Sequence, residues 1–238
     1  MKKNRQHENH PLQEAPATAS PKFIPILFSR EMIKAIISGA KTQTRRVVKI
    51  GGYVPTCSTF PLSTHSCGSV FYFWGNDEIA CPHGSPGDIL WVRETLYQNG
   101  ELELTYDADN ESIDEDLIPS DFKVRLDKNG NYKFCKIPSI YMEKWACRIF
   151  LRVKSLRVER LMDISEDDAV AEGVLPIMLN TMSAYNDYSN PSDSSGYTYP
   201  SDSFRSLWQS INGKESRDAN PWVWVVEFER IERPAGFQ

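Results

Sequence analysis

The sequence has few cysteines and no long apolar run. Its 238 residues include five cysteines, an odd number without any C-x-x-C pair, so the fold does not depend on disulfide bonds and we expect reduced thiols. No apolar stretch approaches the roughly 20 residues that cross a bilayer, and residues 1–22 lack the apolar core of a secretory signal. We therefore expect a cytoplasmic protein without a membrane partner.

An excess of positive charge is also absent. The chain has 27 Lys and Arg residues against 32 Asp and Glu, a net charge of -5, so no bulk binding of duplex DNA is expected, although a local basic face can bind one nucleotide or a short loop. No phosphate-cradling glycine loop, Rossmann fingerprint or Ser-His-Asp constellation is present. The composition, with 40% hydrophobic residues, is that of a globular protein that can bury a core.

The chain divides into a polar tail and one folded unit. Residues 1–22 are polar and are predicted to form a flexible tail, whereas residues 23–232 are predicted to form a single domain. Many short strands and a few short helices indicate an α+β fold, a small curved β-barrel with flanking short helices. Three loop-rich segments are expected to be insertions, at about residues 51–80, 107–135 and 176–203.

Capping residues mark two of the expected helices. Ser29 and Ser165 each precede a segment of helical character and are suited to be N-caps, because a serine hydroxyl accepts hydrogen bonds from free backbone N–H groups. Gly39 and Gly173 follow the two segments, and glycine commonly ends a helix. Both helices are therefore expected to be short.

Apolar alternation marks the main strands. A buried strand is expected over residues 89–93, and a longer one over residues 147–161. In the longer strand the apolar positions change phase near Ser155, which predicts a bulge or a sharp bend there. The chain is expected to finish with a helix over residues 204–211 and a strand over residues 222–228.

The segment G-A-K-T-Q-T-R-R at residues 39–46 concentrates reactive and charged side chains. The Thr44 hydroxyl is a nucleophile only if a base takes its proton, and Lys41 is a base only if its ammonium pKa is lowered. The like charges of Arg45 and Arg46, and burial, would lower it. Lys41 and Thr44 face opposite ways on a regular strand, so joint action requires a turn or bulge. The alternative is a set of solvated residues on a turn.

Glu172 is a candidate general acid. It lies at the C-terminal end of its expected helix, where the helix dipole disfavours a negative carboxylate. A carboxyl group that holds its proton more readily is suited to protonate a leaving group. The alternative is an exposed residue at the end of a helix, free to bind water.

Thiols and imidazoles gather in one irregular segment. Zinc takes four sulfur or nitrogen ligands, but the spacings fit no standard ligand pair apart from the close Cys81 and His83. Lone thiols and surface histidines are the default interpretation, so no metal and no cofactor is expected. The five residues of this segment are Cys57, His65, Cys67, Cys81 and His83.

Four segments, in order, resemble the ASCH domains of the PUA-like superfamily, in the subgroup found in bacteria and their phages. Residues 39–46 resemble the G-x-K-T-x-T-x-R signature, and residues 81–94, with P-G-D-I-L-W-V-R-E, resemble the glycine-aspartate turn and the strand after it. Residues 163–174 resemble the second helix, and residues 204–228 the closing helix and strand. The resemblance covers most of residues 23–232.

The resemblance implies a small β-barrel with a cleft that binds RNA or a modified nucleoside. One bacterial member hydrolyses the acetamide of N4-acetylcytidine, and its catalytic Lys, Thr and Glu match Lys41, Thr44 and Glu172. By analogy, Lys41 deprotonates Thr44, Thr44 attacks the amide carbonyl, and Glu172 handles the proton of the leaving amine. Arg45 and Arg46 are then the expected substrate-binding residues.

Two other functions are compatible with the sequence. The first is a non-catalytic RNA-binding module of phage or prophage origin, with a basic cluster formed by Lys41, Arg45, Arg46 and Lys49. The second is a phage-derived accessory protein whose serine- and tyrosine-rich segment, residues 183–203, binds another protein.

Overall fold

The computed structural model describes residues 20–55, 71–74, 77–99, 103–123, 125–179, 182–190, 192 and 196–237. Most of the predicted flexible tail, residues 1–19, lies outside these ranges, as does much of the predicted insertion at residues 51–80. Within the described residues the fold is mixed α and β, as expected, with one large sheet, three small ones and short helices. None of the described helices is long and apolar enough to cross a membrane.

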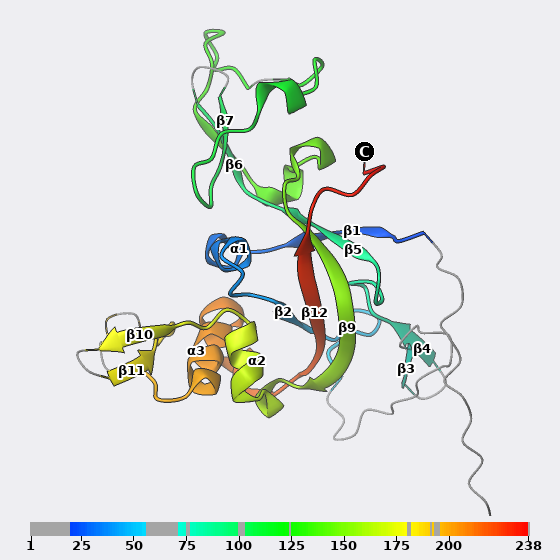
Figure 1. Ribbon diagram of the computed structural model, residues 1–238, viewed down its shortest axis with the longest axis vertical. Helices are drawn as coiled ribbons and strands as arrows, with labels where there is room; N and C mark the ends of the chain where they lie inside the picture. Colours follow the sequence, from blue (N-terminus) through cyan, green and yellow to red (C-terminus); the bar gives the residue numbers. More distant parts are fainter. Residues whose placement is uncertain are drawn as a thin grey trace, which may run out of the picture.

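The large sheet has five strands and a strong curvature (Figure 1). The first pair of neighbouring strands is parallel and the other three are antiparallel. Distant parts of the chain therefore lie side by side in it. In sheet order the strands are β1 (Phe23–Leu27), β5 (Ile89–Arg93), β9 (Phe150–Arg160), β12 (Trp222–Ile231) and β2 (Gln43–Val47).

A bulge in β9 bends the sheet near the predicted position. Glu227 pairs with Ser155 and Phe228 with Val153, so Lys154 is an extra residue in β9. A residue inserted in this way reverses which side chains face the core, and it increases the local twist. The change of phase in the sequence is thereby explained, and the predicted bulge is confirmed.

The sheet is open in the described part of the chain. The edge strands β1 and β2 approach each other where Arg46 Nη2 donates to the Leu27 carbonyl at 2.5 Å, but no strand pairing joins them there. Helix α1 (Arg30–Ile37) connects the two edges along the chain and buries Ile33 and Ile36 in the core. The expected small curved β-barrel is thus not closed among the described residues, where a helix, rather than a ladder of strand hydrogen bonds, links the edges.

Both predicted caps are confirmed. The Ser29 hydroxyl accepts from the Met32 N–H at 3.4 Å at the start of α1, and the Ser165 hydroxyl accepts from the Asp168 N–H at 3.1 Å at the start of α2 (Glu166–Ala171). Helices α3 (Pro200–Asn212) and α4 (Lys214–Asp218) come later in the chain. A separate apolar cluster joins α2 and α3 to one face of the sheet.

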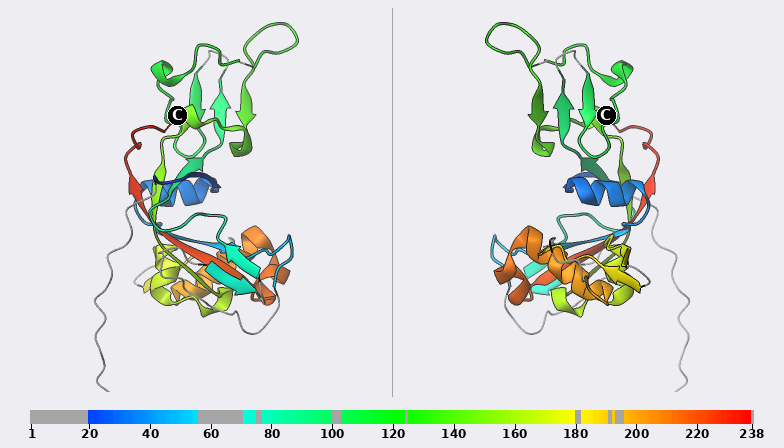
Figure 2. Two further views of the ribbon diagram at one scale, coloured as in Figure 1. Left: turned by 90° about the vertical axis from the view of Figure 1, so that its right-hand side faces the viewer. Right: turned by 90° about the vertical axis from the view of Figure 1, so that its left-hand side faces the viewer.

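A projecting lobe extends from one end of the large sheet (Figure 2). We define it as the described residues between 96 and 146. It contains the described residues of the predicted insertion at 107–135, and its apolar residues share one core cluster with β5, β9 and the end of the chain. Its strands pair in the order β7-β6-β8. The elements are β6 (Leu96–Gln98), β7 (Leu104–Tyr106), β8 (Cys135–Ile137) and the 3-10 helices η1 (Glu115–Leu117), η2 (Ser139–Tyr141) and η3 (Lys144–Ala146).

Two hairpins and one short 3-10 helix complete the fold. Strand β3 (Phe71–Trp74) pairs with β4 (Asp77–Ala80), and β10 (Pro176–Leu179) pairs with β11 (Met182–Tyr185). The second hairpin and the first turn of α3 occupy much of the segment predicted as a loop insertion at residues 176–203. The turn η4 (Leu161–Asp163) follows β9 directly.

Candidate functional site

The site begins where two segments 131 residues apart meet. Lys41 forms a β-bridge with Glu172, and its backbone N–H donates to the Ala35 carbonyl at 2.9 Å. Gly173 makes this approach possible. Its φ is +95°, and a Cβ atom there would lie 3.1 Å from the Ala35 Cβ and 3.2 Å from the Lys41 Cβ. A side chain at this position would therefore be strained and would push the two segments apart.

Lys41 and Glu172 form a buried ion pair. Lys41 Nζ lies 2.6 Å from Glu172 Oε2, and it also donates to the Glu172 carbonyl at 2.9 Å and the Gln43 carbonyl at 2.7 Å. The side chains are 0% and 4% exposed, so the alternatives of a solvated lysine and an exposed glutamate are wrong. Burial lowers the pKa of Lys41, and the charges of Arg46 and Arg45 add to this effect, whereas Glu172 opposes it.

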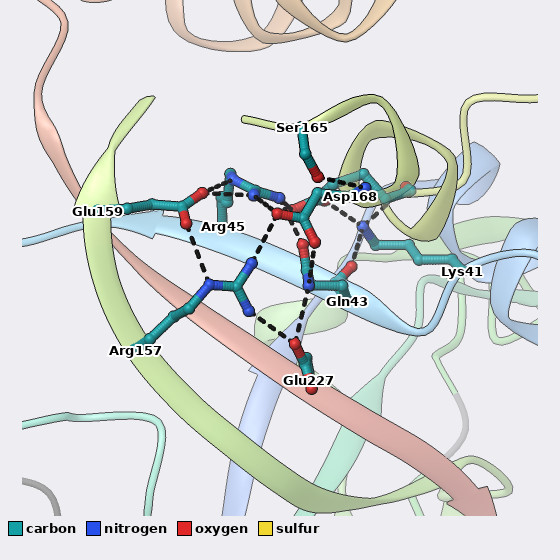
Figure 3. Close-up of polar contacts among 9 residues, drawn as sticks. Lys41, Gln43, Arg45, Arg157, Glu159, Ser165, Asp168 and Glu227 are labelled. Carbon is teal, nitrogen blue, oxygen red and sulfur yellow. Dashed lines mark hydrogen bonds and ion pairs between the residues drawn. The ribbon is translucent and has the colours of Figure 1, made fainter. Parts of the chain in front are cut away.

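Arg45 holds the other oxygen of the Glu172 carboxylate. Its Nη1 donates to Glu172 Oε1 at 3.0 Å and to Gln43 Oε1 at 2.6 Å. Its other N–H groups donate to Glu159 and Asp168, so the guanidinium is buried among three carboxylates and an amide (Figure 3). Glu172 is thus oriented by one cation on each oxygen. Arg45 was predicted to bind substrate, but all of its charge already has partners within the chain.

Further polar residues that the sequence analysis missed extend this site. Arg157 Nη2 donates to Asp168 Oδ2 at 2.7 Å, and its Nη1 donates to Glu227 Oε1 at 2.6 Å. Gln43 Nε2 donates to the same two carboxylates, to Asp168 Oδ1 at 3.1 Å and to Glu227 Oε1 at 3.3 Å. Figure 3 shows these side chains converging from β2, β9, β12 and α2. The available signal was the row of polar residues, Ser155, Arg157 and Glu159, at alternate positions after the bulge.

A small cavity of about 70 Å³ adjoins the ion pair. Thr44, Arg45, Arg46 and Glu172 line it, so four of the five predicted site residues share one cavity. Its volume exceeds that of one water molecule several times but is below the range of usual ligand pockets. The other lining residues are mostly apolar and come from α1, β2 and α3: Met32, Val47, Phe204, Leu207, Trp208, Ile211 and Asn212.

Thr44 lies beside the ion pair. It is 1% exposed, and the carbonyl of the preceding residue, Gln43, accepts a hydrogen bond from Lys41 Nζ. Lys41 belongs to a β-bridge before β2, which begins at Gln43, and no turn or bend lies between Lys41 and Thr44. Joint action of these two side chains therefore stays a prediction. Among the described residues, no other group is hydrogen-bonded to the Thr44 hydroxyl, which leaves it available to a ligand.

The other basic residues do not form a continuous exposed face. Arg46 lies over the Phe28 ring at 5.2 Å and donates to the Leu27 carbonyl. Lys41 and Arg45 are buried, and only Lys49 of the four residues proposed for RNA binding is exposed. An RNA-binding surface made of these four residues is therefore not supported.

The predicted thiol and imidazole candidates are only partly described. The backbone N–H of His83 donates to the Cys81 sulfur at 3.4 Å. Burial raises the pKa of Cys81 to about 12, and burial together with the charge of Arg46 lowers the pKa of His83 to about 4. In the part of the chain that the structure describes, no three His, Cys, Asp or Glu residues form a metal-binding group. Cys57, His65 and Cys67 lie outside the described residues.

Comparisons of the chain with models of known protein families, with curated proteins and with solved structures found no match. The arguments for a function therefore come from the residues and their geometry. A buried lysine–glutamate pair, a threonine hydroxyl and an adjoining cavity are the kinds of group that acyl transfer uses: an acid–base pair, a nucleophile and space for a substrate.

Proposed function

We propose that the chain is an ASCH-type protein of the PUA-like superfamily, and that it hydrolyses the amide bond of an N4-acylated cytidine or a related modified nucleoside. The observation that carries the proposal is the buried Lys41–Glu172 pair at a cavity that Thr44 also lines. The curved sheet with short helices beside it supports the fold assignment. The signature residues Lys41 and Thr44, brought to Glu172 across the chain, support the chemistry.

A proton can pass between Lys41 and Glu172 along their 2.6 Å hydrogen bond. In the ion-paired form the ammonium donates to three acceptors and has no lone pair with which to accept a proton. Transfer to Glu172 gives a neutral amine and a neutral carboxylic acid. Burial favours this form, because it lowers the pKa of Lys41. The pair thus supplies a base and an acid together.

Acyl transfer then proceeds with these two groups. The Lys41 amine takes the Thr44 proton while Thr44 Oγ bonds to the amide carbonyl carbon. As the C–N bond breaks, Glu172 gives its proton to the nitrogen, which leaves as the amino group of the nucleoside, and the acyl group stays on Thr44 as an ester. Arg46, which lines the cavity, places positive charge near the oxyanion.

Hydrolysis of the ester restores the site. Water attacks the ester carbonyl and gives a proton to the Glu172 carboxylate, and the carboxylic acid leaves as Lys41 returns its proton to Thr44 Oγ. Proton transfer from Glu172 to Lys41 re-forms the ion pair. Every proton taken in the first half of the reaction is returned in the second.

The shape of the cavity fits the acyl end of such a substrate. Its lining includes Thr44 and Glu172, and α3 contributes apolar side chains that include Leu207 and Ile211. An apolar wall suits the hydrocarbon part of an acyl group, since burying it removes apolar surface from water. A whole nucleoside exceeds a cavity of about 70 Å³, so the base and sugar are expected to lie at its opening.

The direct test is the release of cytidine from N4-acetylcytidine, followed by chromatography. The wild-type protein is expected to release cytidine, and Thr44→Ala is expected to release none because it has no nucleophile. The matched control is Thr42→Ala, which changes an exposed threonine two residues away and is expected to retain turnover. Turnover by Thr44→Ala would exclude Thr44 as the nucleophile. A folded wild type that releases cytidine from no acylated cytidine would contradict the proposal as a whole.

A further inference from the structure

The projecting lobe exposes aromatic side chains on a sheet face. Tyr97 of β6 and Phe134, one residue before β8, stack with ring centroids 5.9 Å apart and an angle of 21° between their planes. Phe134 is 67% exposed, so the ring offers a free face to solvent. A single exposed ring is ordinary in proteins, so its significance depends on what lies beside it.

One lysine contacts this aromatic pair, and the chain segment beside it is rich in basic residues. The ammonium of Lys136 lies 5.9 Å from the centre of the Tyr97 ring, and the two residues are directly paired across β6 and β8. Residues 121–136 contain five basic and two acidic residues, an excess of three positive charges in a chain whose net charge is -5. All five basic residues are exposed: Lys123, Arg125, Lys128, Lys133 and Lys136.

A buried glutamine fixes this surface to the sheet. Gln98 is 0% exposed; its side-chain amide donates to the Arg125 and Lys133 carbonyls at 2.8 Å and 3.1 Å, and its carbonyl accepts from the Arg125 N–H at 2.9 Å. Between these two positions, Asp127 accepts from the backbone of Asn129 and Asn131. The basic residues are thus carried on an ordered backbone beside the aromatic pair.

Negative charge lies at the opposite edge of the same sheet. The order β7-β6-β8 separates β7 from β8 by one strand, and the acidic residues follow β7, whereas the basic residues precede β8. Two of the acidic residues, Asp109 and Glu111, already pair with Arg148. A negatively charged partner is therefore attracted to the β8 edge of the lobe, where the basic residues and the aromatic pair lie.

We propose that Tyr97, Phe134 and Lys136, with the basic residues beside them, bind single-stranded nucleic acid. An unpaired base stacks on the free face of Phe134, and the neighbouring phosphates contact the lysine and arginine side chains. An exposed aromatic ring and an excess of basic residues complement these two parts of a nucleotide. This binding site is separate from the proposed hydrolysis site, and it does not depend on the proposed chemistry.

The experiment is fluorescence anisotropy of the full chain with a short labelled oligouridylate, with the matching oligothymidylate and with a duplex of the same length, at low and at moderate salt. Both single strands are expected to bind and the duplex to bind less, because stacking needs unpaired bases. Tighter binding of the RNA or of the DNA would identify the natural ligand. No binding of either single strand at low salt, or equal binding of the duplex, would overturn the proposal.

Two variants separate stacking from charge. Phe134→Ala is expected to weaken binding about 5-fold to 150-fold, the equivalent of losing one stacked base. Lys136→Ala is expected to reduce the slope of the logarithm of the binding constant against the logarithm of the salt concentration by about one unit. Both residues are exposed, so folding should be unchanged, and thermal unfolding checks this. Unchanged affinity of a folded Phe134→Ala would also overturn the proposal.

Two controls complete the design. Tyr53→Ala removes another exposed aromatic ring, one that lies outside the lobe, and it is expected to bind as the wild type does. Thr44→Ala is expected to bind nucleic acid normally even though it has lost the proposed nucleophile. Loss of binding in Thr44→Ala would place the nucleic acid at the cavity and contradict a separate surface on the lobe.

Discussion

Two clusters of buried ion pairs, one around Glu172 and one around Glu94, differ in the cations that they contain. Each holds a carboxylate that is no more than 5% exposed against an arginine. At Glu94, Arg148 donates to both oxygens, at 3.0 Å and 2.8 Å, and stacks 3.7 Å over the Tyr106 ring. The carboxylate at Glu172 has an arginine on one oxygen and a lysine on the other.

That lysine changes what the cluster can do. A guanidinium does not lose its proton in proteins, whereas an ammonium does when burial lowers its pKa. The Glu94 cluster therefore holds charges in place: Glu94 follows β5, Arg148 precedes β9, and Tyr106 belongs to β7, so the contacts fix the projecting lobe to the sheet. In the proposed reaction the Glu172 cluster also moves a proton, and it lies beside a cavity.

The largest expected effect on stability concerns the Glu94 cluster. Arg148→Met leaves the fully buried Glu94 carboxylate without its partner, which is expected to lower the free energy of unfolding by about 3–5 kcal/mol. Denaturation with urea measures this loss. Arg148→Lys keeps a charge and is expected to lose less. A Met variant as stable as the wild type would show that the pair does not hold the lobe.

A smaller effect is expected at the apolar wall of the cavity. Leu207→Ala adds space beside the proposed acyl position, so it should shift the preference from acetyl toward longer acyl groups by about 10-fold in the ratio of kcat/KM, a change typical of one or two methylene groups. The rates for N4-acetylcytidine and a longer N4-acyl analogue provide the measurement. An unchanged ratio would mean that the acyl group does not contact α3.

The two clusters should also respond oppositely to pH. Burial alone would raise the pKa of Asp168, but the hydrogen bond from Gln43 and the charges of Arg157 and Arg45 lower it overall. The ionised carboxylate therefore stabilises the fold at pH values above the ordinary pKa of an aspartate. This stability is lost as the pH falls through the lowered pKa of the folded state. Asp168→Asn should be less stable than the wild type at neutral pH, and the difference should shrink in acid.

The reverse is expected at Glu94. Burial raises its pKa, Asp109 and Glu111 add to the rise, and Arg148 opposes it. The folded state then holds the Glu94 proton more tightly than the unfolded state, so this group loses stability as the pH rises from about 4.5 through the raised pKa. Glu94→Gln should remove that decline, as urea denaturation across a pH series would show. A steeper decline in the variant would contradict this sign.

Local signals predicted much of the fold. Serine caps, a glycine after each helix and a change of apolar phase depend on neighbouring residues only, and Ser29, Ser165, Gly173 and the bulge at Lys154 all lie where such signals place them. Closure of the sheet depends on whether its two edge strands, β1 and β2, pair with each other. No local sequence pattern predicts such a pairing. For this reason the expectation of a small curved β-barrel is met only in part: the sheet is curved, but it does not close within the described residues.

In the candidate site, too, local sequence signals predicted some features, and long-range contacts determined the rest. Lys41, Thr44 and Glu172 could be chosen from a signature and from helix position, but their burial and the ion pair between Lys41 and Glu172 could not. The roles of Gln43 and Arg157 depend on the register of β2, β12 and β9, which brings residues 43, 157 and 227 to one face. No local pattern contains that register.

The central claim is that Lys41 exchanges a proton, and replacing it by arginine tests this most directly. Lys41→Arg keeps a positive charge beside Glu172 but removes the group that can act as a base. The measurement is kcat for the release of cytidine from N4-acetylcytidine, with Arg148→Lys as the matched exchange in the other cluster and circular dichroism to confirm folding. The account predicts a loss of about 10²–10⁴-fold in kcat for Lys41→Arg and little change for folded Arg148→Lys. Equal rates for Lys41→Arg and the wild type would contradict it.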